Sequence, residues 1–337
     1  MVTLVTGAAG FIGSHLCRYL VGRGEAVVGI DNLNDYNPVQ LKRDRLRTVA
    51  DAAAAGTGRF TFLELDFSDH VALDQALAGI EIDRIAHLGA QAGVRYSIDN
   101  PRAYAASNLV GHLNLLELAR ARKVAHVVYA SSSSVYGVSP DLPFRVEARV
   151  DFSISLYAAT KKADELMSET YAHLYRLPQT GLRFFTVYGP WGRTDMAMWG
   201  FTQKILDGVP IEVFNHGNML RDFTYIDDII AGVVAALDNP PPDDGAEKAG
   251  GSHSPHRIYN IGNNRAEKLE TMISLIESAC GREAIRIHKP MQPGDVPATY
   301  ADLTAIKRDL GFEPTTPISV GIPRFVEWFR DYRTATA

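Results

Sequence analysis

Apolar runs and amphipathic segments alternate along the first half of the chain. The short apolar runs predict buried strands at 2–6, 26–30, 59–63, 83–88, 124–130 and 179–184. Between these runs, apolar residues recur at helical spacing and predict helices near 11–23, 39–52, 69–79, 101–121 and 155–175. Because this alternation is typical of right-handed βαβ units, we predict an α/β fold with a Rossmann-like, doubly wound parallel sheet.

The rhythm changes after residue 186, where the elements become shorter and are broken by glycine and proline. We therefore predict a smaller, partly interleaved C-terminal substrate domain. Residues 1–186 would form the Rossmann domain, and residues 222–262 would return to it through a strand near 257–262. The second domain would then consist of 187–221 and 263–332.

Three glycines follow the first apolar run at a spacing of three and three. Gly7, Gly10 and Gly13 separate this strand from the next helix, with Phe11 and Ile12 between them. Glycine allows a tight turn and a close approach of the backbone to a pyrophosphate, and the start of a helix offers free N–H groups. This context, a strand before and a helix after, predicts a dinucleotide-binding loop.

Acids and small residues follow the next strands. Asp31 and Asn32 end the second strand, near the distance expected for an acid that binds an adenosine ribose. Because a carboxylate would repel a 2′-phosphate, we predict NAD rather than NADP. Asp66 with Phe67, and Leu88 with Ala90, also stand at strand ends, where they would flank the cofactor or serve as an ordinary helix cap and packing residues.

Tyr157 and Lys161 are four residues apart on a predicted helix and therefore share one face of it. A cation one turn away favours the phenolate form of a tyrosine, which can then act as a base. Taken alone, such a pair is also common on helices where the tyrosine packs and the lysine is solvated. The serines at 131–134 follow a buried strand, where ligands bind in open α/β sheets, and this favours the catalytic interpretation.

Composition limits the classes of partner. The chain has 337 residues, of which 46% are hydrophobic, and a net charge of −5, so we expect a globular enzyme without nucleic-acid or membrane partners. Cys17 and Cys280 stand far apart without metal-ligand spacing, which predicts buried thiols in a reducing compartment and no metal. With no apolar run of membrane-spanning length and no leader before the first strand, we expect a cytoplasmic protein.

Several motifs, which occur in the family's order over nearly the whole chain, resemble those of the extended short-chain dehydrogenase/reductase superfamily. These are Thr6–Gly13, the serine segment with Tyr157 and Lys161, Arg221–Asp228 and Pro293–Asp302. Further segments are similar to those of the UDP-glucuronate 4-epimerases, namely Ala90–Ser97, Ser107–Gly111, Thr186–Arg193 and Phe214–Gly217.

This resemblance implies NAD-dependent, reversible C4 epimerisation of UDP-glucuronate to UDP-galacturonate. Tyr157 would take the proton of the C4 hydroxyl while hydride leaves C4 for NAD⁺, and the 4-keto sugar would rotate before hydride and proton return on its other face. Lys161 would hold the nicotinamide ribose, and a serine would hydrogen-bond the C4 oxygen. The resemblance leaves Ser132 and Ser134 both as candidates for that serine.

The resemblance also implies the remaining binding residues. Ser107 and Ala130 would join the cofactor site. The nucleotide-sugar site, formed by residues of both predicted domains, would use Arg95, Ser132, Ser133, Ser134, Thr186, Arg193, Phe214, Arg221 and Asp295. Among these, Thr186 and Arg193 would clamp the sugar carboxylate, Arg221 would neutralise the diphosphate and Asp295 would bind the uridine ribose. Phe214 would lie against uracil or belong to the core.

Other functions on the same scaffold stay possible at this point. A UDP-glucose/galactose 4-epimerase would not need the carboxylate clamp. Sugar dehydratases and UDP-glucuronate decarboxylases of the superfamily carry acids in the segment that is Ser133–Ser134 here. A redox-sensing regulator would have no use for Tyr157 and Lys161. The resemblance further implies a homodimer that forms through helices 101–121 and 155–175.

Overall fold

The computed structural model describes residues 1–292 and 296–336. Its centre is a parallel sheet of seven strands in the order β3-β2-β1-β4-β5-β6-β10. The strands are β1 (Val2–Thr6), β2 (Ala26–Asp31), β3 (Arg59–Glu64), β4 (Arg84–His87), β5 (His126–Ser132), β6 (Gln179–Phe184) and β10 (His256–Ile261). The order reverses at β1, so the predicted doubly wound Rossmann-like sheet is confirmed.

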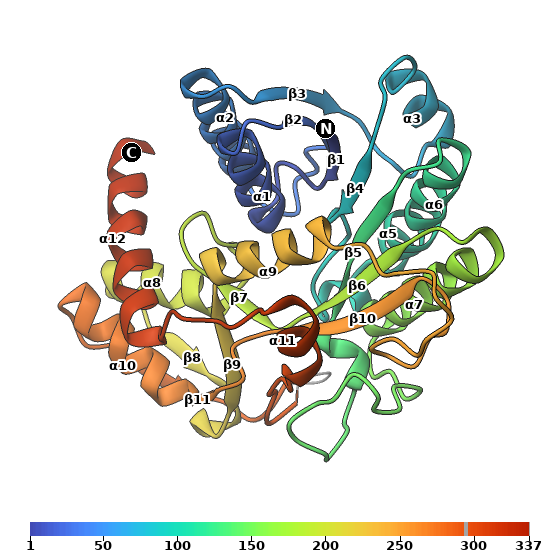
Figure 1. Ribbon diagram of the computed structural model, residues 1–337. Coiled ribbons are helices and arrows are strands. Elements are labelled where there is room, and N and C mark those ends of the chain that lie inside the picture. The colour runs from blue at the N-terminus through green and yellow to red at the C-terminus, as the bar shows by residue number, and fades with distance from the viewer. Residues whose placement is uncertain (293–295, 337) are drawn as a thin grey trace.

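Helices cover both faces of this sheet (Figure 1). One face carries α1 (Phe11–Gly22), α2 (Val39–Ala55) and α9 (Ile226–Asp238), and the other carries α3 (His70–Ala76), α6 (Gly111–Ala121) and α7 (Leu156–Tyr175). The neighbouring β1 residues Leu4 and Val5 are both fully buried but belong to different hydrophobic clusters. Successive side chains of a strand point to opposite faces, so both faces of β1 are buried.

The predicted helix at 101–121 is present but changes its winding. α5 (Pro101–Tyr104) leads into the π-helical stretch η1 (Ala105–Val110), and α6 follows directly. Within η1, the Asn108 side chain accepts a hydrogen bond from the Gln91 N–H (2.8 Å) and donates one to the Gln91 carbonyl (3.1 Å). π-helical turns often occur at functional sites, and this one ties α6 to the loop after β4.

The chain after β6 builds smaller sheets (Figure 1). β7 (Thr186–Tyr188) and β11 (Ala266–Lys268) flank β9 (Leu220–Tyr225), and β8 (Ile211–Val213) pairs with β12 (Arg286–His288). The remaining elements are α4 (Tyr96–Asp99), η2 (Ser133–Tyr136), α8 (Ala197–Asp207), η3 (Phe214–Gly217), α10 (Leu269–Cys280), α11 (Thr304–Leu310) and α12 (Ile318–Thr336). The strand expected near 257–262 does rejoin the main sheet, as β10 beside β6. The division into two domains stays a prediction.

No helix in the described ranges has both the length and the apolar composition to cross a membrane.

Candidate active site

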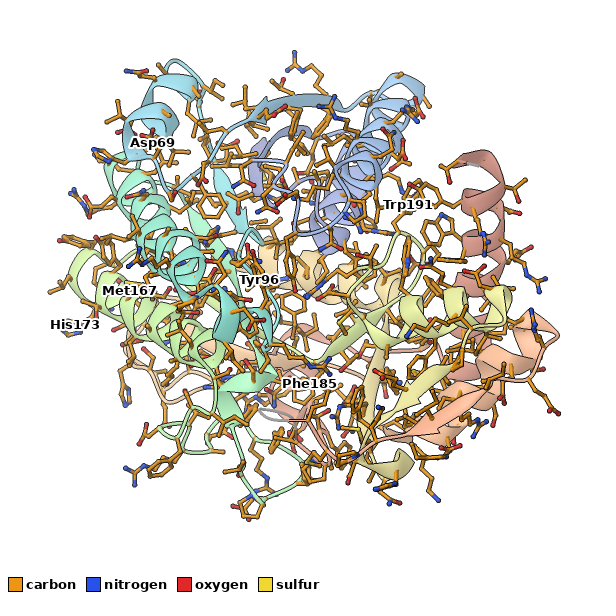
Figure 2. All side chains as sticks on the ribbon, turned by 180° about the vertical axis from the view of Figure 1, so that it is seen from behind. Asp69, Tyr96, Met167, His173, Phe185 and Trp191 are labelled. Atoms are coloured by element: carbon orange, nitrogen blue, oxygen red, sulfur yellow. The ribbon has the colours of Figure 1, made fainter. Side chains whose placement is uncertain are left out.

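A cavity of about 730 Å³ opens at the carboxyl edge of the main sheet. Residues at or just after the ends of β1, β2, β4, β5 and β6 line it, and the loop after β7 adds its opposite wall. Figure 2 labels two lining residues, Tyr96 of α4 and Phe185 after β6, near the middle of the molecule. This edge is where open parallel sheets bind their ligands.

The glycine loop brings Gly7, Gly10 and Gly13 to one end of the cavity. A Cβ atom on Gly13 would lie 2.0 Å from the Gly7 carbonyl oxygen, and one on Gly7 would lie 2.8 Å from Gly89 Cα. Gly7 also has a φ of +69°, and its carbonyl accepts the Gly10 N–H at 2.8 Å. The backbone is therefore exposed to the cavity at the start of α1, where the helix dipole and free N–H groups favour an anion.

Asp31 is buried at the end of β2 and is held by the backbone. Its two oxygens accept hydrogen bonds from the N–H groups of Ala9 (3.2 Å) and Leu33 (2.9 Å). Lys42 of α2, which the sequence did not single out, lies 3.5 Å away. Burial lowers the pKa of Lys42, and the charge of Asp31 opposes that shift. The carboxylate lines the cavity beside Asn32, as predicted for the ribose acid.

Most of the other predicted cofactor residues also line the cavity, namely Gly10, Phe11, Ile12, Phe67, Leu88, Ala90, Ser107 and Ala130. Asp66 does not belong to the lining; it accepts hydrogen bonds from the Asn32 side chain (3.0 Å) and the Ser68 N–H (2.9 Å). Burial raises the pKa of Asp66, but these hydrogen bonds outweigh it and leave the pKa below its usual range. Asp66 therefore orients Asn32.

Tyr157 and Lys161 both line the cavity from α7, whose start is capped by Ser155 accepting the Ala158 N–H at 3.1 Å. The Lys161 ammonium donates to Asp164 at 3.1 Å, and both side chains are almost fully buried. Burial raises the pKa of Asp164 to about 6, against the opposing charge of Lys161. Asp164 was not predicted from the sequence, although its i,i+3 spacing from Lys161 on a helix is typical of an ion pair.

The serine hydroxyls lie close together, but through a helical turn and not through the extended backbone that was expected. An extended segment would point Ser132 and Ser134 the same way, but β5 ends at Ser132 and η2 begins at Ser133. The 3₁₀ turn nevertheless joins them: Ser132 Oγ accepts the Ser134 N–H (3.2 Å) and the Ser134 hydroxyl (2.9 Å). Both line the cavity together with Ser133. The neighbouring Ser131 hydroxyl donates to Glu165 at 2.7 Å.

The wall opposite the sheet contains Thr186, Arg193 and Arg221. The Arg193 guanidinium donates to both carboxylate oxygens of Asp195 through Nε (2.9 Å) and Nη2 (2.5 Å). The Tyr36 hydroxyl donates to the same carboxylate at 2.9 Å. Burial raises the pKa of Asp195, but Arg193 and Tyr36 outweigh it and lower the pKa. Asp195 thus occupies the Nε and Nη2 donors on one edge of the guanidinium, and an arginine has five donors in all.

Of three further predicted substrate residues, one lines the cavity, one does not, and one lies outside the described residues. Arg95 lines the cavity, with its guanidinium 5.5 Å from the centre of the Phe214 ring. Phe214 does not line the cavity and packs against the main hydrophobic cluster, which favours the core interpretation over the uracil one. Asp295 lies outside the described residues.

The doubly wound sheet, the glycine cradle and the Tyr157–Lys161 pair in one cavity define an extended short-chain dehydrogenase/reductase. The sequence profile of the GDP-mannose 4,6 dehydratase family matches residues 4–325. The chain belongs to this family.

Several relatives are similar over their full length. The protein CapI of Staphylococcus aureus is 46% identical, with 98% of this chain and 99% of CapI covered. A probable UDP-glucuronate 4-epimerase of Rhizobium meliloti is 44% identical, with 98% of each chain covered. The crystal structure of UDP-glucuronic acid 4-epimerase from Bacillus cereus, in complex with UDP-glucuronic acid and NAD, is 32% identical with a TM-score of 0.85, covering 98% of this chain and all of that one.

Proposed function

We propose that this protein is a UDP-glucuronate 4-epimerase that interconverts UDP-glucuronate and UDP-galacturonate with NAD. The observation that carries the proposal is the single cavity that holds the glycine loop, the Tyr157–Lys161 pair, the serine pair and Arg193. The relatives from Rhizobium meliloti and Bacillus cereus support the choice of substrate.

The residues at the glycine loop fit a dinucleotide. Any Cβ at Gly7 or Gly13 would collide with the backbone, so this end of the cavity accepts a pyrophosphate against bare N–H groups. Asp31 would take the hydroxyls of the adenosine ribose, and its charge disfavours a 2′-phosphate. When bound, NAD supplies a reversible hydride acceptor at the sugar C4.

The proton chemistry belongs to α7 and η2. Tyr157 would remove the proton from the C4 hydroxyl and return it after the sugar has turned over. Lys161, fixed by Asp164, would hold the nicotinamide ribose beside Tyr157. The Ser132–Ser134 pair would donate to the C4 oxygen, where negative charge develops.

The sugar carboxylate makes the intermediate vulnerable, because a 4-keto uronate is a β-keto acid that can lose CO₂. Arg193 with Thr186 would hold the carboxylate and keep its C–C bond out of line with the carbonyl π system. This contact would use guanidinium donors of Arg193 other than those that bind Asp195.

The alternatives on this scaffold find less support. Elimination or decarboxylation in related enzymes uses an acid at the positions of Ser133 and Ser134, and hydroxyls stand there. Among the described lining residues, the carboxylates are Asp31, Asp99 and Asp195, of which Asp31 is bound by backbone N–H groups and Asp195 by Arg193. A neutral UDP-hexose would leave the Arg193 fork unmatched.

We also propose that two copies associate through α6 and α7. Leu113, Leu166 and Leu174 of these helices are 40%, 58% and 60% exposed. Large apolar side chains with such exposure are typical of a surface that a second protein copy covers. Sedimentation would show a dimer that Leu166→Glu weakens, whereas a monomer at all concentrations would reject this assembly.

The decisive experiment is to incubate the purified protein with UDP-glucuronate and NAD and to separate the sugar nucleotides. We expect UDP-galacturonate as the main product, approach to the same mixture from either epimer, and no net NADH. A pentose product with CO₂ would indicate a decarboxylase instead. Conversion of UDP-glucose at a comparable rate would indicate the neutral-sugar epimerase.

A further inference from the structure

Arg45 of α2 is a buried cation outside the reacting groups. It is 1% exposed, and its guanidinium donates to three backbone carbonyls. The acceptors are Ala9 O (3.2 Å from Nη1), Trp191 O (3.0 Å from Nε and 2.8 Å from Nη2) and Gly192 O (2.8 Å from Nη2). One side chain thus joins the glycine loop to the residues immediately before Arg193.

The buried environment of Arg45 is energetically unfavourable for a charged side chain. Within the described part of the chain, no carboxylate lies within ion-pair distance of its guanidinium. Burial lowers its pKa to about 10, although the charge of Asp31 opposes the shift. Since burying a cation without an anionic partner is unfavourable, a role beyond packing is expected of it.

The loop that Arg45 holds is strained and is braced from its other side. Trp191 has a φ of +62°, a left-handed conformation that is rare for a bulky residue. Its ring contacts Trp328 and Tyr332 of α12 at centroid distances of 5.1 and 5.2 Å, and Figure 2 shows Trp191 close to that helix. Strain of this kind persists only where surrounding contacts impose it.

The loop after β2 holds the same segment at two more points. The Tyr36 hydroxyl donates to Asp195, and Asn37 Oδ1 accepts the backbone N–H (3.1 Å) and the hydroxyl (3.0 Å) of Thr194. Residues on both sides of Arg193 are therefore anchored to the half of the molecule that carries the glycine loop and Asp31.

We propose that Arg45 is a positioning residue for Arg193: by fixing the Trp191 and Gly192 carbonyls to the glycine loop, it aims the Arg193 guanidinium at the carboxylate of the sugar. Selection of a uronate over a neutral hexose then depends on an α2 side chain that lines the same cavity and acts on the sugar carboxylate through Arg193. This inference rests on the proposed function.

The test measures binding in a background that cannot turn over. Holoenzyme carrying Tyr157→Phe is titrated with UDP-glucuronate and with UDP-glucose. The Kd of UDP-glucose divided by the Kd of UDP-glucuronate, called the ratio below, reports the carboxylate contact. Arg45→Met, which keeps the volume but removes the donors, should lower this ratio about tenfold through weaker UDP-glucuronate binding, with the Kd of UDP-glucose little changed. Arg47→Met, an exposed cation on the same helix, is the matched control and should leave the ratio unchanged.

A double variant separates positioning from a general structural role. Once Arg193→Ala has removed the carboxylate contact, adding Arg45→Met should lower the ratio no further. Equal weakening of both ligands by Arg45→Met, or a further loss in the double variant, would overturn the proposal. If Arg45→Met does not fold, Arg45→Lys serves: its single ammonium spans fewer carbonyls, so a smaller fall of the ratio supports the role and an unchanged ratio rejects it.

The two proposals fail in different ways. If Arg193→Ala leaves the ratio unchanged, the carboxylate clamp and with it the proposed substrate are wrong. If Arg193→Ala abolishes the preference and Arg45→Met retains it, only the positioning role of Arg45 is rejected.

Discussion

The glycine loop and the Arg193 loop face the same cavity but are built in opposite ways. The glycine loop presents backbone, and the residues that shape it lie within one short stretch between Gly7 and Gly13. The Arg193 loop presents a side chain, and its shape depends on Tyr36, Asn37 and Arg45, which are more than 140 positions away.

This difference explains what each region can tolerate. A backbone site fails when an atom is added, because a Cβ at Gly7 or Gly13 would collide with neighbouring backbone and displace the loop. A side-chain site fails by degrees, because several partners share the task of orienting one guanidinium. Substitutions in the two regions should therefore differ in kind as well as in size.

Tyr157→Phe should give the largest effect, because Tyr157 lines the cavity that both regions face and is the proposed proton carrier. Removing the hydroxyl takes away the proton carrier alone, so we expect turnover to fall by about a thousandfold with NAD and UDP-sugar affinities nearly unchanged. Steady-state kinetics and ligand titration measure the two quantities. Tyr175→Phe, at the exposed end of the same helix, is the control. Turnover near that of the unaltered protein would remove Tyr157 from the mechanism.

Gly13→Ala should abolish the function of the backbone region. The new Cβ would lie 2.0 Å from the Gly7 carbonyl, so the loop must shift and lose its contacts to the pyrophosphate. We expect NAD affinity to fall by about a hundredfold. Gly22→Ala, at the end of the same helix, meets no atom within 4 Å and should bind NAD normally. Equal affinities for the two variants would contradict the cradle.

The same contrast determines how much of the molecule the sequence could predict. The main sheet follows from local apolar runs, because parallel strands buried on both faces are rich in apolar residues. The π-helical winding of Ala105–Val110 has no such signature, since the apolar spacing around it continues as in an α-helix. The short strands after residue 186 take their partners from distant segments, which local periodicity does not reveal.

In the site, residue type at a strand end predicted cavity-lining groups such as Asp31, helical spacing predicted Tyr157 and Lys161, and Arg193 was predicted only through the family resemblance. The groups that hold them were missed. Asp164 behind Lys161, Asp195 behind Arg193, and Arg45 act through contacts that only the folded chain creates. Asp66 and Phe214 each stand at a strand end but do not line the cavity: Asp66 accepts a hydrogen bond from Asn32, and Phe214 packs against the main hydrophobic cluster, as in the core alternative predicted for it.

Arg193→Ala should give an intermediate effect, confined to substrates with a carboxylate. Losing a charged, bidentate contact should weaken UDP-glucuronate by about ten- to a hundredfold and leave UDP-glucose nearly unchanged. Because the carboxylate is then unrestrained in the 4-keto intermediate, CO₂ release should rise relative to epimer formation. Trapped ¹⁴CO₂ from labelled substrate measures this. Arg308→Ala, an exposed cation on α11, is the control, and an unchanged product ratio in Arg193→Ala would reject the clamp.

The serine pair should give the smallest effect, because its two hydroxyls share one task. Ser134 donates to Ser132 at 2.9 Å, so Ser132 can pass its own proton toward the C4 oxygen while Ser134 supports it. Ser132→Ala should then lower kcat by about tenfold or somewhat more, and Ser134→Ala by less, with KM nearly constant in both. If the order is reversed, Ser134 is the direct donor. If the double variant loses the full product of the two single effects, the hydroxyls act independently and the hydrogen-bonded pair has no catalytic meaning.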